Sequence, residues 1–224
     1  MLELFHVSKT YQGAGGRVAA LRDVNLKLAP GEFLSVVGPS GSGKTTLMNI
    51  LGCLDSPSQG EYRLMGQKAG GLAPNQAARL RNQAIGFIFQ SFNLAPALTA
   101  LENVELPLSF RGQSRALRRQ AALEALAQVG LADRANHRPS ELSGGQQQRV
   151  AAARVIATQP PLILADEPTG SLDRAAGDQV MALLGQMNRQ GCAVVLITHD
   201  PRAAAQAPRR LRMENGRLLP LEGQ

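Results

Sequence analysis

The sequence predicts an α/β fold with a mainly parallel β-sheet. Residues 32–52 run from an apolar, β-branched stretch through a glycine-rich turn into a pattern with helical spacing. Two more apolar runs, 162–166 and 193–198, flank a helical pattern over 173–190. Strands that alternate with helices in this way are typical of a parallel sheet, which collects its active groups at the carboxyl ends of the strands.

Length and composition indicate one cytoplasmic domain over residues 1–224. A chain of this length can bury a core, and no apolar run approaches the roughly 18 residues of a membrane-spanning helix. The first residues lack the basic flank and apolar core of a secretory signal. Cys53 and Cys192 have no nearby cysteine partner, so we expect both to be small, buried residues in a reducing compartment.

The formal net charge of +7 comes mostly from arginine and suits nucleic acid or an anionic membrane surface. The two arginine clusters are not interleaved with stacking aromatics, which favours solvated faces over a nucleic-acid groove. These clusters are Arg111, Arg115, Arg118 and Arg119, and Arg209, Arg210 and Arg212.

The other elements are predicted from periodicity and turn residues. Helical patterns with capping boxes at Thr99 and Ser143 indicate a helical subdomain at about 91–158. Strands are expected over 2–7 and 24–28 around a glycine-rich turn at 13–16, over 61–65 and 85–90, and in a hairpin at Asn215-Gly216, with a helix over 75–82.

Residues 38–45 read G-x-x-x-x-G-K-T, between the first parallel strand and its helix. Glycines let backbone N–H groups turn toward an anion, and the helix adds its positive N-terminal end. Lys44 would reach the outer phosphates and the Thr45 hydroxyl would hold Mg²⁺. A glycine-rich surface loop is the alternative, but the flanking strand and helix are the context that a phosphate loop requires. The predicted nucleotide-binding residues of this loop are Gly38, Ser40, Gly41, Ser42, Gly43, Lys44, Thr45 and Thr46.

Polar residues follow three of the predicted strands and should meet at one sheet edge. Successive strand residues point to opposite sides, so Asp166 and Glu167 can take different roles at the site. Asp166 would bind Mg²⁺ and Glu167 would polarise the attacking water. Gln90 and His199 reach the same edge, where His199 can hydrogen-bond a phosphate oxygen or that water. A structural histidine and an ordinary pair of exposed acids are the alternatives.

Residues 142–146 open a helix and offer a second anion site made of a hydroxyl, two small residues and a helix N-terminus. Because the chain already has one phosphate loop, this second anion site is expected to bind another nucleotide or to act with another copy of the chain. Its residues are Ser143, Gly144, Gly145 and Gln146.

In their order along the chain, these motifs resemble those of the ABC-type ATPases. They correspond to the Walker A motif (38–45), Q-loop (Gln90), signature (142–146), Walker B motif (Asp166-Glu167), D-loop (171–173) and H-loop (His199). The resemblance implies a P-loop ATPase of ABC type, with an antiparallel β subdomain and a helical subdomain, that hydrolyses ATP to ADP and phosphate. It also implies Mg²⁺ bound near Thr45, Gln90 and Asp166.

The same resemblance implies partners. Tyr11 would stack on adenine, although an aromatic residue that fills a hairpin is the alternative. Two copies would pair head to tail, so that each nucleotide lies between residues 38–46 of one and 143–146 of the other. Residues 47–55, 90–94 and 101–108 resemble the ATP-binding subunits of the lipoprotein-releasing and macrolide-exporting branch. Those subunits bind a separate membrane permease, which would hold this chain on the inner face of the membrane.

Two other functions are compatible with these ATPase motifs. A soluble ABC ATPase acting on nucleic acid or ribosomes normally has two cassettes, zinc-binding cysteines or a long coiled coil, and none is found here, so no nucleic acid is expected. A regulatory scaffold would bind nucleotide only to dimerise. The uncharged stretch 91–98, with Phe92 and Leu94, is expected to line a cleft for a permease helix, or else to fold back into the helical subdomain.

Overall fold

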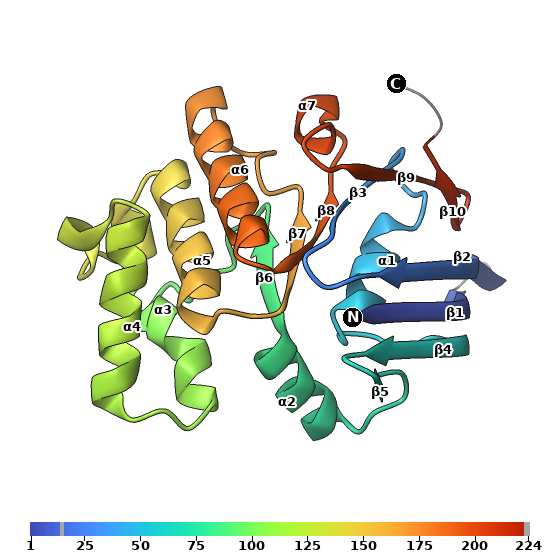
Figure 1. Cartoon of the computed structure of the whole chain (residues 1–224), viewed down its shortest axis with the longest axis horizontal. Coiled ribbons are helices and arrows are strands. Elements are labelled where there is room, and N and C mark those ends of the chain that lie inside the picture. The colour runs from blue at the N-terminus through green and yellow to red at the C-terminus, as the bar shows by residue number, and fades with distance from the viewer. Residues whose placement is uncertain (14–15, 222–224) are drawn as a thin grey trace.

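The structure is a computed structural model, and it describes residues 1–13 and 16–221. A parallel sheet occupies the middle, an antiparallel sheet lies at one end, and a group of helices lies at the other (Figure 1). This arrangement confirms the predicted α/β class with a mainly parallel sheet.

The central sheet has six strands in the order β10-β9-β3-β8-β7-β6. All neighbours pair in parallel except β9 and β10, which form the predicted hairpin around Asn215-Gly216. In register, Phe89 lies opposite Asp166 and Asp166 opposite Ile197, so three strands end level at one edge. The strands are β3 (Phe33–Val37), β6 (Ile85–Phe89), β7 (Leu162–Asp166), β8 (Ala193–Ile197), β9 (Arg209–Glu214) and β10 (Arg217–Pro220).

The second sheet is antiparallel, in the order β2-β1-β4-β5. Its two long strands extend well beyond the predicted ranges 2–7 and 24–28, because register shifts after Leu4, Val7 and Lys9 break the alternation of buried residues while the pairing continues. Gly13 pairs with Gly16, and the rest of the predicted turn lies outside the described residues. The strands are β1 (Leu2–Gly13), β2 (Gly16–Leu28), β4 (Gln59–Leu64) and β5 (Gln67–Lys68).

The long helices lie close to their predicted positions, whereas the short α7 was not predicted. Capping boxes at Thr99 with Glu102 and at Ser143 with Gln146 are confirmed. Within residues 1–13 and 16–221, no helix has both the length and the apolar character needed to cross a membrane. The helices are α1 (Lys44–Leu51), α2 (Pro74–Ala84), α3 (Ala100–Phe110), α4 (Arg115–Gln128), α5 (Gly144–Thr158), α6 (Arg174–Arg189) and α7 (Pro201–Ala204), with 3₁₀ turns at Ala132–Arg134 and Pro139–Glu141.

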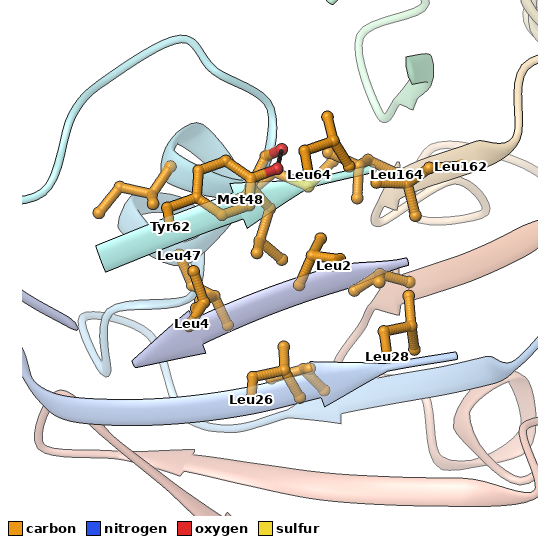
Figure 2. Close-up of a cluster of buried hydrophobic side chains, with 14 of the residues drawn as sticks. Leu2, Leu4, Leu26, Leu28, Leu47, Met48, Tyr62, Leu64, Leu162 and Leu164 are labelled. Atoms are coloured by element: carbon orange, nitrogen blue, oxygen red, sulfur yellow. Dashed lines mark hydrogen bonds between the residues drawn. The ribbon is translucent and has the colours of Figure 1, made fainter. Parts of the chain in front are cut away.

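Helix α1 is the link between the two sheets. Its buried residues Leu47 and Met48 contact a cluster that contains leucines of β1, β2, β4 and β7 (Figure 2). The opposite face of the parallel sheet is covered by α5 and α6, and α3, α4 and α5 enclose a third apolar cluster. Burial of each such leucine contributes about 1.5–3 kcal/mol, so the phosphate loop before α1 stands on a rigid base.

Two expectations about individual side chains were wrong. The Arg111 guanidinium is not solvated: it donates to the backbone carbonyl oxygens of Asn82 and Thr158, both at 2.7 Å, and it closes the end of α3 against α2 and α5. Cys53 is buried as predicted, but Cys192 is partly exposed because it lies in the turn before β8 and not in the strand.

Candidate functional site

A cavity of about 680 Å³ lies at the carboxyl ends of β3, β7 and β8. It collects residues that are widely separated in the sequence and that were predicted separately as phosphate-binding, metal-binding and catalytic. The predicted residues that line it are Ser40, Gly41, Gly43, Lys44, Thr45, Thr46, Gln90, Asp166, Glu167 and His199.

The glycine-rich loop is held in a shape that side chains would disturb. Gly43 caps α1 with φ +110°, and a Cβ on it would lie 2.5 Å from the Ala20 carbonyl oxygen. A Cβ on Gly38 would collide with the Met213 carbonyl oxygen. Gly38 and Ser42 do not line the cavity and support the loop from behind, where the buried Ser42 Oγ finds no hydrogen-bond partner among the described residues.

Positive charge is concentrated where the loop enters α1. The first turn of this helix carries no acidic residue, so its N-terminal N–H groups are not compensated. The Lys44 ammonium reaches back across the loop and donates to the carbonyl oxygens of Gly38 at 2.7 Å and Pro39 at 2.8 Å. Phosphate oxygens can replace these carbonyls and would give stronger, charge-assisted bonds. The loop therefore suits a phosphate chain.

The two acids at the carboxyl end of β7 have different environments. Burial raises the pKa of Asp166, the neighbouring Glu167 raises it further, and Lys44 opposes both effects. Glu167 has φ +46° and turns toward the end of β8. There its carboxylate accepts from Thr198 Oγ1 at 3.0 Å and from the His199 backbone N–H at 2.9 Å.

Glu167 and His199 also form a direct pair. His199 Nδ1 lies 2.7 Å from Glu167 Oε1, and the imidazole is 74% exposed whereas the carboxylate side chain is only 16% exposed. An ionised carboxylate accepts only, so this contact places the imidazole proton on Nδ1. The sequence predicted both residues at this edge but not their contact, nor the role of Thr198 beside them.

Gln90 follows β6 and is packed against the segment after Glu167. Its backbone carbonyl accepts from Ser171 Oγ at 3.0 Å, and a Cβ on Gly170 would lie 3.0 Å from its Nε2. The cavity thus offers the Thr45 hydroxyl, the Gln90 amide and the Asp166 carboxylate. These are hard oxygen ligands, and Mg²⁺ takes few of them from protein because it keeps waters and substrate phosphates, so the set fits Mg²⁺.

The structure does not bring the second anion site to this cavity. Ser143 caps α5 by accepting from the Gln146 N–H at 3.3 Å, and Gln146 Oε1 accepts from the Ser143 N–H at 2.8 Å. Gly144 and Gly145 follow in the first turn of the helix. None of these residues lines the cavity.

Tyr11 also lies outside the residues that line the cavity. Its hydroxyl donates to Asp55 Oδ2 at 2.8 Å, and the Lys9 ammonium lies 4.9 Å from the ring centroid. The ring is 38% exposed, and its cross-strand neighbour Val18 does line the cavity. Tyr11 is therefore held beside the phosphate loop, and its stacking on adenine stays a prediction.

Sequence reasoning missed two walls of the cavity. One is formed by β2, and the other by the hairpin turn Asn215-Gly216, which was predicted as a turn but not placed. Gly216 explains the placement, since its N–H donates to the Ser42 carbonyl at 2.9 Å and its own carbonyl accepts from the Arg22 N–H at 2.8 Å. The lining residues from these walls are Val18, Ala19, Ala20, Arg22, Asn215 and Gly216.

A strand, a glycine loop and a helix N-terminus, with acids at the end of a neighbouring parallel strand, define a P-loop nucleotide-binding protein. The sequence model of the ABC transporter family matches residues 21–170, and the chain belongs to that family. This confirms the resemblance inferred from the order of the motifs.

Similar proteins and a similar solved structure support the assignment to this family. The ABC transporter ATP-binding protein YvrO of Bacillus subtilis is 48% identical over 98% of this chain and 96% of its own length. The macrolide export ATP-binding/permease protein MacB of Photorhabdus laumondii is 48% identical over 98% of this chain, which spans 34% of MacB. A dimeric structure of the ATP-binding cassette MJ0796 with ADP and Pi superposes with a TM-score of 0.91 at 46% identity and full coverage of both chains. The ABC-type fold is thereby confirmed.

Proposed function

We propose that the chain is the ATP-hydrolysing subunit of an ABC transporter, that two copies act together, and that they drive a separate membrane permease. The observation that carries this proposal is the cavity, which places Lys44, Asp166 and Glu167 at one sheet edge. Residues 1–224 would act as one cassette, with a helical subdomain at about 91–158.

Binding would use the loop and the two charges beside it. Backbone N–H groups at the start of α1 and the Lys44 ammonium hold the β and γ phosphates. Thr45, Gln90 and Asp166 would hold Mg²⁺, which neutralises charge on the phosphates when bound. The Thr45 hydroxyl lies at the first turn of α1, so the same helix that binds phosphate also presents a metal ligand.

Hydrolysis would depend on Glu167 and the residues that orient it. Its carboxylate is fixed from β8 by Thr198 and His199, so a water beside the γ phosphate would meet an acceptor in one orientation. The mostly exposed imidazole of His199 would orient Glu167 through Nδ1–H, and its Nε2 would accept from the attacking water. Gln90, packed on the segment after Glu167, would close the other side of that water.

The second copy would complete each site. Ser143 and Gln146 present a capped helix N-terminus at the surface, away from the cavity of their own chain. The solved MJ0796 cassette is a dimer bound to ADP and Pi, and 46% identity over the full chain supports the same assembly here. In a head-to-tail pair, residues 143–146 of one copy would bind the phosphates held by residues 38–46 of the other.

The proposed ATP hydrolysis can be tested by measuring phosphate release from Mg-ATP. The purified chain is expected to hydrolyse ATP at a rate that rises more steeply than linearly with protein concentration, because each site needs residues from two copies. DNA or RNA should not change the rate, since no nucleic-acid partner is proposed. Tight ATP binding without turnover would support the scaffold alternative instead.

The permease would dock in a groove of about 1,040 Å³ between α2, β6, α3 and α5. The groove combines the rings of Phe87, Phe89 and Phe110 with four arginines. Arg111 and Arg154 donate to backbone carbonyls there, and burial lowers the pKa of both guanidinium groups. An amphipathic helix with an aromatic or aliphatic anchor and an acidic side chain would fit this surface. The four arginines are Arg79, Arg81, Arg111 and Arg154.

The stretch 91–98 contributes Asn93 to this groove. Phe92 and Leu94 do not line it. Leu94 packs against the cluster of α3, α4 and α5, and the Phe92 ring lies near Gly144, so for both residues the alternative of folding back into the helical region is the correct one.

The combined substitution Phe110→Ser and Arg79→Glu is expected to abolish co-purification with the membrane subunit that accompanies the wild type from detergent-solubilised membranes. Both side chains are exposed in the groove, Phe110 at 74%, so basal ATPase should stay within about threefold. Leu117→Ser is the control, because Leu117 is 61% exposed on α4 outside the groove. A complex that survives the groove substitutions would place the permease elsewhere.

A further inference from the structure

Gln148 is a buried polar residue that the mechanism above does not use. It lies in α5, five residues after the cap Ser143, and its exposed fraction is 0%. Its Nε2 donates to the Phe89 carbonyl at 3.2 Å and to the Pro168 carbonyl at 2.7 Å. Phe89 precedes Gln90, and Pro168 follows Glu167. One amide thus contacts the backbone beside both residues that would act on the attacking water.

The orientation of this amide is fixed by its partners. Two carbonyl oxygens need two donors, which Nε2 has and Oε1 lacks, so the side chain cannot be flipped. Gln148 Oε1 has no hydrogen-bond partner among the described residues. A buried acceptor without a partner is costly, and an apolar residue would avoid that cost. The two donated bonds are therefore what Gln148 supplies at this position.

Arg154 ties the same helix to the same segment. Its guanidinium donates to the Asn93 carbonyl at 2.7 Å and to the Phe92 carbonyl at 3.0 Å. Gln148 and Arg154 thus hold the stretch on both sides of Gln90 against α5. A displacement of this helix would move the Q-loop, and through Gln148 it would also move the segment that follows Glu167.

We propose that Gln148 is a positioning residue that couples the signature end of α5 to Gln90 and Glu167 of its own chain. This inference rests on the proposed head-to-tail pair. There, residues 143–146 bind the nucleotide of the partner copy, while Gln90 and Glu167 act on the nucleotide of their own. Occupation of one site then sets the position of α5 and, through Gln148, the geometry of the catalytic groups in the other site. Hydrolysis at the two sites is cooperative for this reason.

Gln148→Leu removes both donors and keeps a side chain of similar size. We expect kcat to fall about tenfold or more, and the Hill coefficient for ATP to fall toward 1. The affinity of the isolated chain for a non-hydrolysable ATP analogue should change less than about threefold, because Gln148 does not line the cavity. Thr158→Val is the matched control: it removes a buried hydroxyl from the same helix that bonds only to the helix's own carbonyls.

Gln148→Glu provides a second readout, through pH. The neutral acid has one donor for the two carbonyls and the carboxylate has none, and burial favours the neutral form. The ratio of its kcat to that of the wild type should therefore rise as pH falls from about 8 to 6, which a purely structural role would not produce. In Gln148→Leu this ratio should stay flat.

Three outcomes would overturn the proposal. The first is a kcat and Hill coefficient of Gln148→Leu that equal those of the wild type or of Thr158→Val. The second is a pH profile of Gln148→Glu that parallels the wild type. The third is failure of both Gln148 variants to fold, which would make Gln148 a folding residue. A wild type that lacks cooperative ATP hydrolysis would instead refute the proposed function itself, so the two failures are distinguishable.

Discussion

Lys44→Ala is expected to abolish tight binding of ATP, with a loss in affinity of at least about a hundredfold. Lys44 is the lysine that lines the cavity, and its ammonium already spans the loop to the Gly38 and Pro39 carbonyls, where phosphate oxygens would take their place. A hydrogen bond to a charged group contributes about 1.5–3 kcal/mol, and two such bonds to the β and γ phosphates account for the loss. Isothermal titration with Mg-ATP measures it.

Lys27→Ala is the control for this experiment. Lys27 lies on β2, its side chain is 79% exposed, and it pairs with Glu3 outside the cavity. Its removal lowers the net charge by the same amount, so it reports any general effect of charge on ATP binding. The Lys44→Ala chain should melt close to the wild type, since the ammonium contacts only carbonyls of the loop. Unchanged affinity would refute the phosphate-loop assignment.

Elements with strong local signals could be predicted from the sequence. The apolar strands β7 and β8 are buried throughout their lengths apart from the final Asp166, so their composition alone identifies them. The caps Thr99 and Ser143 bond to residues three positions ahead, which makes them readable from a short motif. The phosphate loop can also be predicted from a short motif, because its anion site is made by consecutive backbone groups.

The parts that could not be predicted depend on contacts between distant segments. Glu167 and His199 meet because β7 and β8 are adjacent and parallel. The order of the strands in the sheet cannot be deduced from the sequence. The turn at Asn215-Gly216 closes the cavity only because its backbone bonds to Ser42. The length of β1 was underestimated because register shifts interrupt its burial pattern while its backbone stays paired.

The docking surface shows a different limit. The uncharged stretch 91–98 was a reasonable candidate, since exposed apolar residues mark interaction sites. In the structure Leu94 is partly buried against the helical region, whereas Phe110, at the end of α3, is 74% exposed. Hydrophobicity of a segment does not say which of its residues remain exposed after packing, so a groove formed by α2, β6, α3 and α5 escaped prediction.

Glu167→Gln is expected to slow hydrolysis by about 10²–10⁴-fold while ATP binding survives. The amide oxygen can still accept from the His199 backbone N–H, and the amide nitrogen can donate to Thr198 Oγ1, so the shape of the site is kept, but a neutral amide cannot polarise water. The substitution also removes the neighbouring charge that helps to raise the pKa of Asp166, which leaves that carboxylate free to hold Mg²⁺. Phosphate release under saturating Mg-ATP measures the loss, with Glu124→Gln, an exposed acid on α4, as the control.

The same variant tests the shared site directly, because ATP that is bound but not hydrolysed should hold two copies together. Size-exclusion chromatography with Mg-ATP should show a dimer for Glu167→Gln and mostly monomer for the wild type. Adding Ser143→Arg to Glu167→Gln should restore the monomer, since Ser143 caps α5 away from its own cavity and its bulky replacement would block only the nucleotide of the partner copy. A Glu167→Gln chain that stays monomeric at saturating ATP, or a dimer that tolerates the change at Ser143, would exclude the head-to-tail pair.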